Sequence, residues 1–210
     1  MPLSVDELLI ADPAAAWSDA GFRIDGDVCA VGSVRLRLVG REPGTGILGW
    51  SLRGVPPDSA DLDGIPTTTS AAAATTGTTH PNGVTAIDHV VLLSPDLGRT
   101  VEALAVVGVH PRRERDGELG GRAIRQIFFR LGAVIVEAVG PPDTAGEGPS
   151  TLWGITYVVA DIDDTAAFFG GNAAPVKDAV QPGRRITTLR HRDLGMSVRT
   201  AFISAPILGA

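Results

Sequence analysis

The chain has 210 residues, of which 44% are hydrophobic and 20% charged, and its formal net charge is −6. This acidic balance argues against a nucleic-acid partner, and no apolar run approaches the roughly 20 residues needed to cross a bilayer. The single cysteine, Cys29, excludes an internal disulfide and a multi-cysteine metal site. The N-terminus has Asp6 and Glu7 instead of the basic start of a signal peptide, so we expect a cytoplasmic protein without a membrane partner.

Residues 1–55 show a short β-α-β-β pattern. "SVDELLIAD" predicts a strand, "PAAAWSDAGF" a helix, and "GDVCAVG" and "SVRLRLVG" two further strands. A sheet of this size cannot bury both of its faces alone, so it should pack on the rest of the chain or on a second subunit. The next segment, 56–83, is rich in Thr, Ala, Pro and Gly and has no sustained period, which predicts a linker.

Residues 84–141 predict the order β-α-β-β-β. "AIDHVVLL" is rich in β-branched residues and predicts a strand, after which Ser94 to Asp96 start a helix that ends at Gly108. Three strands follow in "HPRRERDG", "RAIRQIFFRLG" and "AVIVEAVGP". The same order recurs over 150–205, from "TLWGITYVVADI" to "MSVRTAFIS".

The sequence repeats itself in detail. "VDELLIADP" resembles "IDHVVLLSP", "VRLRLVG" resembles "VIVEAVG", and "GILGWSLRGV" resembles "TLWGITYVV", which indicates copies of one supersecondary unit. With "IDHVVLLSPDLGRTVEAL" and the closing "VIVEAVGP", the chain resembles the vicinal oxygen chelate superfamily of glyoxalases, extradiol dioxygenases, and fosfomycin- and bleomycin-resistance proteins. The resemblance implies an α+β fold in which paired βαβββ units form a mixed sheet curled around an open cleft. It places this domain at 84–210, with a truncated third unit at 1–55.

The resemblance also implies a divalent metal site, with one ligand in the first and one in the last strand of each unit. The first unit supplies His89 and Glu137, whose imidazole nitrogen and carboxylate oxygen are common metal ligands. The second unit has Gly154 and either Thr200 or Ala201 at these points. Half of the expected ligands are therefore missing, and the sequence leaves open whether any cofactor binds.

His89 is a histidine within an otherwise apolar strand. Alternation places Ile87, His89, Val91 and Leu93 on one face, where His89 is either hydrogen-bonded in the cleft wall, in contact with a ligand, or bound to a metal. Glu137 interrupts the apolar run "AVIVEAV", and a buried carboxylate needs a partner or a wet environment. It is either the best candidate for a general base in the cleft or part of a structural pair with His89 or an arginine.

Five further residues are candidates for ligand contact. Trp153 and Tyr157 lie four apart on one strand, so regular alternation directs both to one face, either the cleft or the core. Phe128 would add stacking area, and Gln126 shares its face and offers an amide. Arg185 would receive a carboxylate or phosphate if it lies at the cleft mouth; the alternative is a solvated hairpin.

Two functions follow from these residues. The first is an enzyme, a lyase or oxygenase acting on a small oxygenated metabolite, in which His89 and Glu137 bind a metal or act as an acid/base pair. The second is a metal-free protein that holds a small, partly aromatic molecule in the cleft, as resistance-type relatives do. Both require a small-molecule ligand, and exposed sheet edges favour a homodimer.

Overall fold

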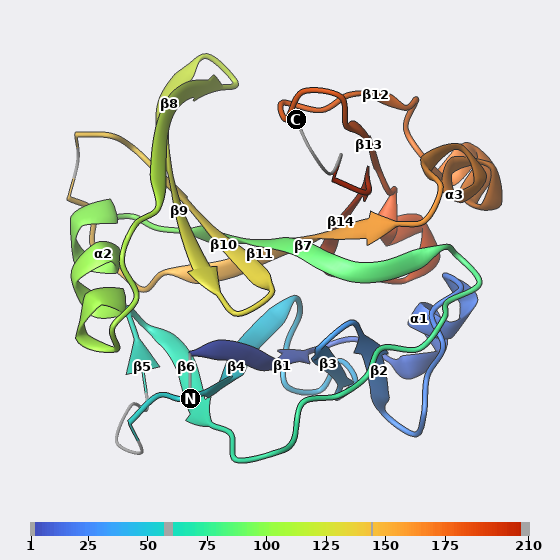
Figure 1. Cartoon of the computed structure of the whole chain (residues 1–210), viewed down its shortest axis with the longest axis horizontal. Coiled ribbons are helices and arrows are strands. Elements are labelled where there is room, and N and C mark those ends of the chain that lie inside the picture. The colour runs from blue at the N-terminus through green and yellow to red at the C-terminus, as the bar shows by residue number, and fades with distance from the viewer. Residues whose placement is uncertain (1–2, 57–60, 144, 207–210) are drawn as a thin grey trace.

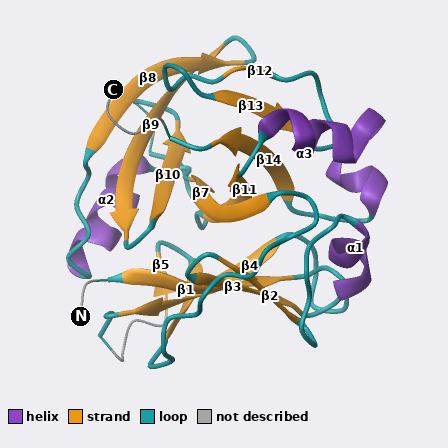
Figure 2. Cartoon of the chain, turned by 45° about the vertical axis from the view of Figure 1, so that its right-hand side comes forward, coloured by secondary structure: helices purple, strands orange, loops and turns teal. Residues whose placement is uncertain are grey.

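The chain forms two sheets that lie one against the other (Figure 1). The computed structural model describes residues 3–56, 61–143 and 145–206. Within these residues, no helix is both long enough and apolar enough to cross a membrane. The predicted fold class is confirmed: strands dominate, helices are few, and the larger sheet curls around an open face (Figure 2).

The N-terminal sheet has six strands in the order β2-β3-β1-β4-β6-β5. Its elements are β1 (Ser4–Ile10), α1 (Ala14–Asp19), β2 (Val28–Val31), β3 (Val34–Leu38), β4 (Ile47–Arg53), β5 (Asp61–Leu62) and β6 (Ile65–Thr69). Residues 61–69 are thus sheet where the sequence predicted a linker. In β6, Ile65 and Thr67 are buried while Pro66 and Thr68 are exposed, and this short alternation of β-branched residues suits a strand.

The C-terminal sheet has eight strands in the order β12-β13-β14-β11-β7-β10-β9-β8. Its first unit comprises β7 (Val84–Leu93), α2 (Leu97–Val106), β8 (Arg113–Leu119), β9 (Arg122–Leu131) and β10 (Val134–Gly140). Its second comprises β11 (Thr151–Val159), α3 (Ile162–Phe169), the 3₁₀ turn η1 (Gly170–Asn172), β12 (Lys177–Asp178), β13 (Arg185–Thr188), η2 (His191–Leu194) and β14 (Arg199–Ser204). Both units show the β-α-β-β-β order that the sequence predicts.

The N-terminal sheet repeats the pairing of the C-terminal one. Strand β1 pairs in parallel with β3 and antiparallel with β4, and β4 pairs in parallel with β6. In the same way β7 pairs with β10 and β11, and β11 pairs with β14. The N-terminal half is therefore a trimmed copy of both units, where the sequence predicted one truncated unit.

The core lies between the two sheets. Phe22 of the N-terminal half packs on Tyr157 of β11 with ring centroids 5.3 Å apart, and Phe169 stacks on Phe202 behind them at 5.0 Å. Because these faces are used for packing, the opposite, concave face of the C-terminal sheet remains for a ligand.

Two buried aspartates fix the halves to each other. Asp12, after β1, accepts hydrogen bonds from the backbone N–H and the Oγ of Ser197, at 2.9 and 2.6 Å. Asp63, in the β5–β6 turn, accepts hydrogen bonds from Thr100 and Ser150 of the C-terminal half. The side chains of Asp12 and Asp63 are 0% and 2% exposed, so the hydrogen bonds that join the two halves are shielded from water.

Candidate functional site

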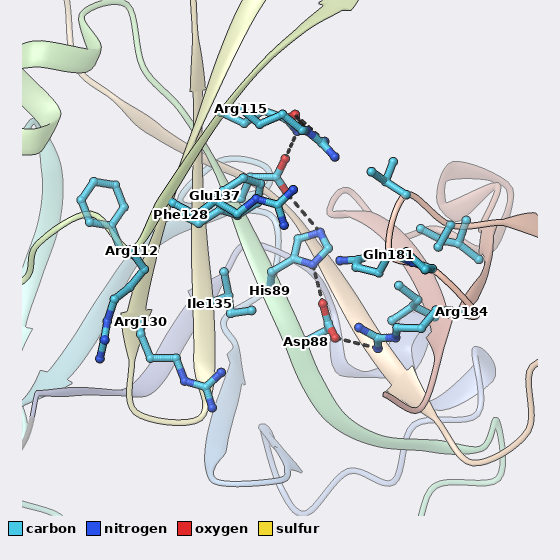
Figure 3. Close-up of a pocket in the computed structure, with 18 of the residues that line it drawn as sticks. Asp88, His89, Arg112, Arg115, Phe128, Arg130, Ile135, Glu137, Gln181 and Arg184 are labelled. Carbon is cyan, nitrogen blue, oxygen red and sulfur yellow. Dashed lines mark hydrogen bonds and ion pairs between the residues drawn. The ribbon is translucent and has the colours of Figure 1, made fainter. Parts of the chain in front are cut away.

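A cavity of about 680 Å³ opens on the concave face of the C-terminal sheet. Figure 3 shows its lining, which comes from β7, β8, β9 and β10 on one side and from β12, β13 and β14 on the other. His89 and Glu137 both belong to this lining. The structure therefore brings together the two residues that the sequence marks as the centre of the site.

Cross-strand register explains why these side chains meet. Glu137 of β10 is paired with Phe128 of β9 and Val91 of β7, while Ile135 is paired with His89. Direct partners in a sheet point to the same face, so two neighbouring rows of side chains form the cavity floor.

A bulge in β7 adds a third functional group. In the pairing with β11, His89 is opposite Thr156 and Ile87 is opposite Tyr157, so Asp88 is an extra residue. A bulge interrupts the alternation of a strand. Asp88 and His89, adjacent in sequence, therefore both reach the cavity. Sequence analysis missed Asp88 because regular alternation directs it to the opposite face.

His89 stands between two carboxylates (Figure 3). Its Nδ1 lies 2.8 Å from Oδ2 of Asp88, and its Nε2 lies 3.4 Å from Oε2 of Glu137. Arg184 forms an ion pair with the other oxygen of Asp88 at 2.7 Å. All four side chains are at most 14% exposed, so these interactions are shielded from bulk water.

The same chain of contacts continues from Glu137 towards β8. Gln126 donates its amide N–H to Oε1 of Glu137, and its carbonyl oxygen accepts a hydrogen bond from Nε of Arg115 at 2.8 Å. We call the six residues Arg115–Gln126–Glu137–His89–Asp88–Arg184 the polar chain. It crosses the cavity floor and has a guanidinium group at each end.

His89 has charged partners on both sides within the polar chain. Burial raises the pKa of Asp88, but hydrogen bonds from His89 and Arg184 outweigh it and keep this pKa below its usual value. Nδ1 of His89 is directed at the ionised Asp88, and Nε2 is directed at a carboxylate oxygen of Glu137. His89 and Glu137 are therefore the side chains of the cavity best placed to exchange a proton with a ligand.

The other predicted residues divide into two groups. Gln126 and Phe128 line the cavity, as alternation along β9 requires. Tyr157 lies in the core, and Trp153 is 42% exposed with the guanidinium of Arg199 4.5 Å from its ring centre; neither lines the cavity. The pairing of β11 with β7 skips Trp153, which indicates a bulge. The bulge interrupts the alternation along β11, so Trp153 and Tyr157 do not share the face that the sequence predicted for both.

Arg185 does not face the cavity either. Its guanidinium pairs with Asp163 at the exposed start of α3, at 2.6 Å. The neighbouring Arg184 takes the inward position, where its side chain is 8% exposed. The sequence predicted Arg185 and not its neighbour, because no clear alternation precedes the Pro182–Gly183 turn to show which of the two faces inward.

The donor set does not fit a metal. In the first unit His89 is paired with Ile135, and Glu137 lies two residues further along β10. In the second unit Gly154 is paired with Arg199, and Ala201 lies two residues further along β14. Gly154 and Ala201 therefore match His89 and Glu137. The second unit therefore offers no ligating side chain at the two matching points. Among the residues that the structure describes, no group of three or more His, Cys, Asp or Glu side chains is arranged to hold an ion. Both nitrogens of His89 are already directed at carboxylates.

The sequence matches no protein-family model and no curated protein. Its structure is similar to that of a mutant of 4-hydroxymandelate synthase from Streptomyces coelicolor, with a TM-score of 0.67 and 15% identity over 100% of this chain and 95% of that one. It is also similar to an extradiol ring-cleaving dioxygenase from B. fuscum, with a TM-score of 0.60 and 14% identity over 99% of this chain and 72% of that one. For catechol 2,3-dioxygenase the TM-score is 0.59, with 13% identity over 99% and 96%. These identities are low, so the similarity shows the fold.

Proposed function

We propose that this chain, which has the fold of the vicinal oxygen chelate superfamily, binds a small organic molecule on its concave sheet without a metal and exchanges a proton with it. The observation that carries the proposal is the imidazole of His89 held between Asp88 and Glu137 at the floor of a cavity of about 680 Å³. A cavity of this volume is in the range of small-molecule sites.

The roles within the site follow from the geometry. Asp88 orients the ring of His89 and keeps Nδ1 protonated, while Arg184 holds Asp88 in place. Nε2 and Glu137 then give a proton to, or take one from, a ligand seated above them. Gln126 fixes the rotamer of Glu137 through its amide. No step requires an oxidant, so proton transfer suits this donor set better than oxygenation.

The second candidate is a protein that holds its ligand without changing it. The observation that favours it is the polar chain, whose six side chains are engaged with one another within the protein. In this alternative the polar chain is a rigid floor, and the cavity walls provide the binding energy.

Two measurements on the purified full chain test the proposal. Mass spectrometry for metals, after incubation with Zn²⁺, Ni²⁺, Mn²⁺ and Fe²⁺ and removal of free ions, should find far less than one equivalent per chain. Nitrogen-detected NMR of the imidazoles should show Nδ1 of His89 protonated and Nε2 sensitive to Glu137→Gln. One equivalent of metal that is lost in His89→Ala would overturn the metal-free site.

The binding-only candidate is separated by hydrogen exchange. A bound carbonyl compound with an acidic C–H should exchange that hydrogen for deuterium in D₂O, and Glu137→Gln should slow the exchange at unchanged affinity. Binding without any catalysed exchange, across a series of such compounds, would favour the protein that only holds its ligand.

A further inference from the structure

We infer that the ligand carries an anionic oxygen group, a carboxylate or a phosphate, which the paired arginines Arg113 and Arg115 of β8 bind. This inference rests on the proposed function and names the ligand class for the same cavity. It starts from a contrast in charge. The chain has a net charge of −6, whereas the cavity lining holds six Arg and Lys side chains against three Asp and Glu. A concave surface of this sign attracts anions.

Not all of these cations are free to bind an anion. Arg184 is already paired with Asp88 at 2.7 Å. Arg115 donates only to the neutral amide of Gln126, and Arg113 forms no ion pair with any residue that the structure describes. Arg112, Arg130 and Lys177 of the lining also form no ion pair with the described residues. Arg113 and Arg115 are distinguished from them because both contact one aromatic ring, that of Phe128.

The amide of Gln126 keeps the charge of Arg115 available. It lies between Arg115 and Glu137, donating to the carboxylate and accepting from the guanidinium. A direct ion pair between Arg115 and Glu137 would neutralise both groups, yet none is formed. The arginine is thus held beside the acid–base pair without losing its charge to it.

Phe128 holds both guanidinium groups in position. The Cζ atom of Arg113 lies 5.9 Å from the centre of the Phe128 ring, and that of Arg115 lies 6.0 Å from it. Both distances are in the range of cation–π contact. Phe128 was expected to stack on a ligand; in the structure its ring supports the two arginines. Two guanidinium groups that contact one ring favour an anion with several oxygens, such as carboxylate or phosphate.

The opposite wall carries apolar surface beside its charged residues Lys177, Asp178 and Arg184. Val180, in the turn between β12 and β13, lines the cavity and is 70% exposed, and Ile186 of β13 and Ile203 of β14 also line it. In Figure 1 the β8–β9 hairpin and the β12–β13 region stand on the two sides of the open sheet. A ligand with an anionic head and an apolar body would fill both walls and cover the exposed valine.

Matched acid and amide probes test this inference. Binding of 3-phenylpropionate, 3-phenylpropionamide and phenyl phosphate to the full chain is followed by backbone amide NMR, with shifts at cavity residues as the readout. The acid should bind about tenfold more tightly than the amide, the gain expected for one charge-assisted interaction. The phosphate probe decides between the two anion types, and higher salt should weaken both anions but not the amide.

Two sets of variants test whether the preference for the acid depends on Arg113 and Arg115. Arg113→Gln with Arg115→Gln should remove the preference for the acid and leave the affinity for the amide. Arg125→Gln is the matched control on the same hairpin, because Arg125 pairs with exposed Asp116 and does not line the cavity. It should keep the preference.

The outcomes separate the two proposals. Acid and amide binding equally well at the cavity would overturn the anionic ligand and leave the proposed function standing. A preference that survives in the double variant, or that is lost in Arg125→Gln, would overturn the role of the β8 pair. Absence of shifts at the cavity with every probe would overturn the proposed binding function and this inference with it.

Discussion

The concave face of the C-terminal sheet and its counterpart in the N-terminal half have the same strand pairing, but the first is open and the second is covered. Glu7 of β1 is paired with Arg35 of β3. His89 of β7 is paired in the same way with Ile135 of β10, so Glu7 corresponds to His89. The preceding residues, Asp6 and Asp88, correspond as well. In the C-terminal half these positions line an open cavity. In the N-terminal half the side chains at these positions form ion pairs with one another, and the segment after β6 covers them.

The N-terminal face is satisfied from within. Asp6 pairs with Arg35 and Arg53, and Glu7 pairs with Arg37 at 3.0 Å. The segment after β6 covers this cluster, because Ser70 donates to Asp6 and the carbonyl of Ala72 accepts from Arg53 at 2.9 Å.

The difference teaches how to tell a structural ion-pair cluster from a site on one fold. Both faces carry buried carboxylates and arginines, so charge alone does not distinguish them. In the N-terminal cluster every arginine on the face is neutralised by an acid, whereas on β8 the arginines are not. The surplus charge and the open cavity occur together on the C-terminal face, and for this reason we propose that face as the ligand site.

The largest effect is expected at Asp6. Its side chain is 3% exposed and that of Arg53 is 8% exposed, so Asp6→Ala leaves a buried guanidinium unpaired. We expect a loss of about 3–5 kcal/mol in the free energy of unfolding, measured by urea denaturation. Asp27→Ala is the control, because Asp27 pairs with Arg37 at the surface and is 56% exposed. Similar losses for both variants would mean that the cluster is not what stabilises this half.

Glu137 should show the reverse pattern. Glu137→Gln keeps the shape and an amide in place of the carboxylate, so we expect the free energy of unfolding to change by less than about 1 kcal/mol. Proton exchange with a bound ligand should nevertheless be slowed, because the amide cannot accept a proton. The equivalent change in the N-terminal cluster, Glu7→Gln, should leave ligand exchange intact. A ligand effect of equal size in both variants would contradict a functional difference between the two faces.

The elements were predictable from the sequence, whereas the composition of the site was only partly so. Repeated patterns of β-branched residues and turns predicted both units of the C-terminal sheet, and His89 and Glu137 were identified as polar residues in apolar strands. Bulges at Asp88 and Trp153 could not be predicted, because a bulge depends on the partner strand. The β8 arginines were missed for a related reason: only the cross-strand contact with Phe128 shows that they are organised.

A smaller effect tests why the second unit has no ligand opposite His89. A Cβ atom at Gly154 would lie 2.9 Å from the carbonyl oxygen of Arg199, so β11 or β14 must shift to accept any side chain. We expect Gly154→Ala to cost about 1–3 kcal/mol, seen as a lower melting temperature. Gly171→Ala is the control, since a Cβ atom at that position would have no neighbour within 4 Å. Equal melting temperatures would show that a side chain is tolerated at Gly154 and that the missing ligand is not a matter of space.

The smallest effect concerns the pH dependence of the N-terminal half. His80 differs from His89 because no carboxylate among the described residues pairs with it. Burial lowers the pKa of His80, in spite of a hydrogen bond to the carbonyl of Ala30. Its Nδ1 accepts the backbone N–H of Arg23 at 3.0 Å, and protonation would break this contact. Because the folded state binds fewer protons than the unfolded state, stability is full above about pH 6.5 and falls as the pH drops below it.

His80→Gln tests this sign, since its amide keeps one acceptor for Arg23 and one donor for Ala30. Between pH 7.5 and 5.5 the melting temperature of the wild type should fall more than that of the variant, and the other three histidines, present in both proteins, cancel in the comparison. Parallel curves would show that His80 does not contribute. Asp88 does not disturb this window because its lowered pKa places its titration at more acidic pH, so the response of the N-terminal half is measured separately from that of the cavity.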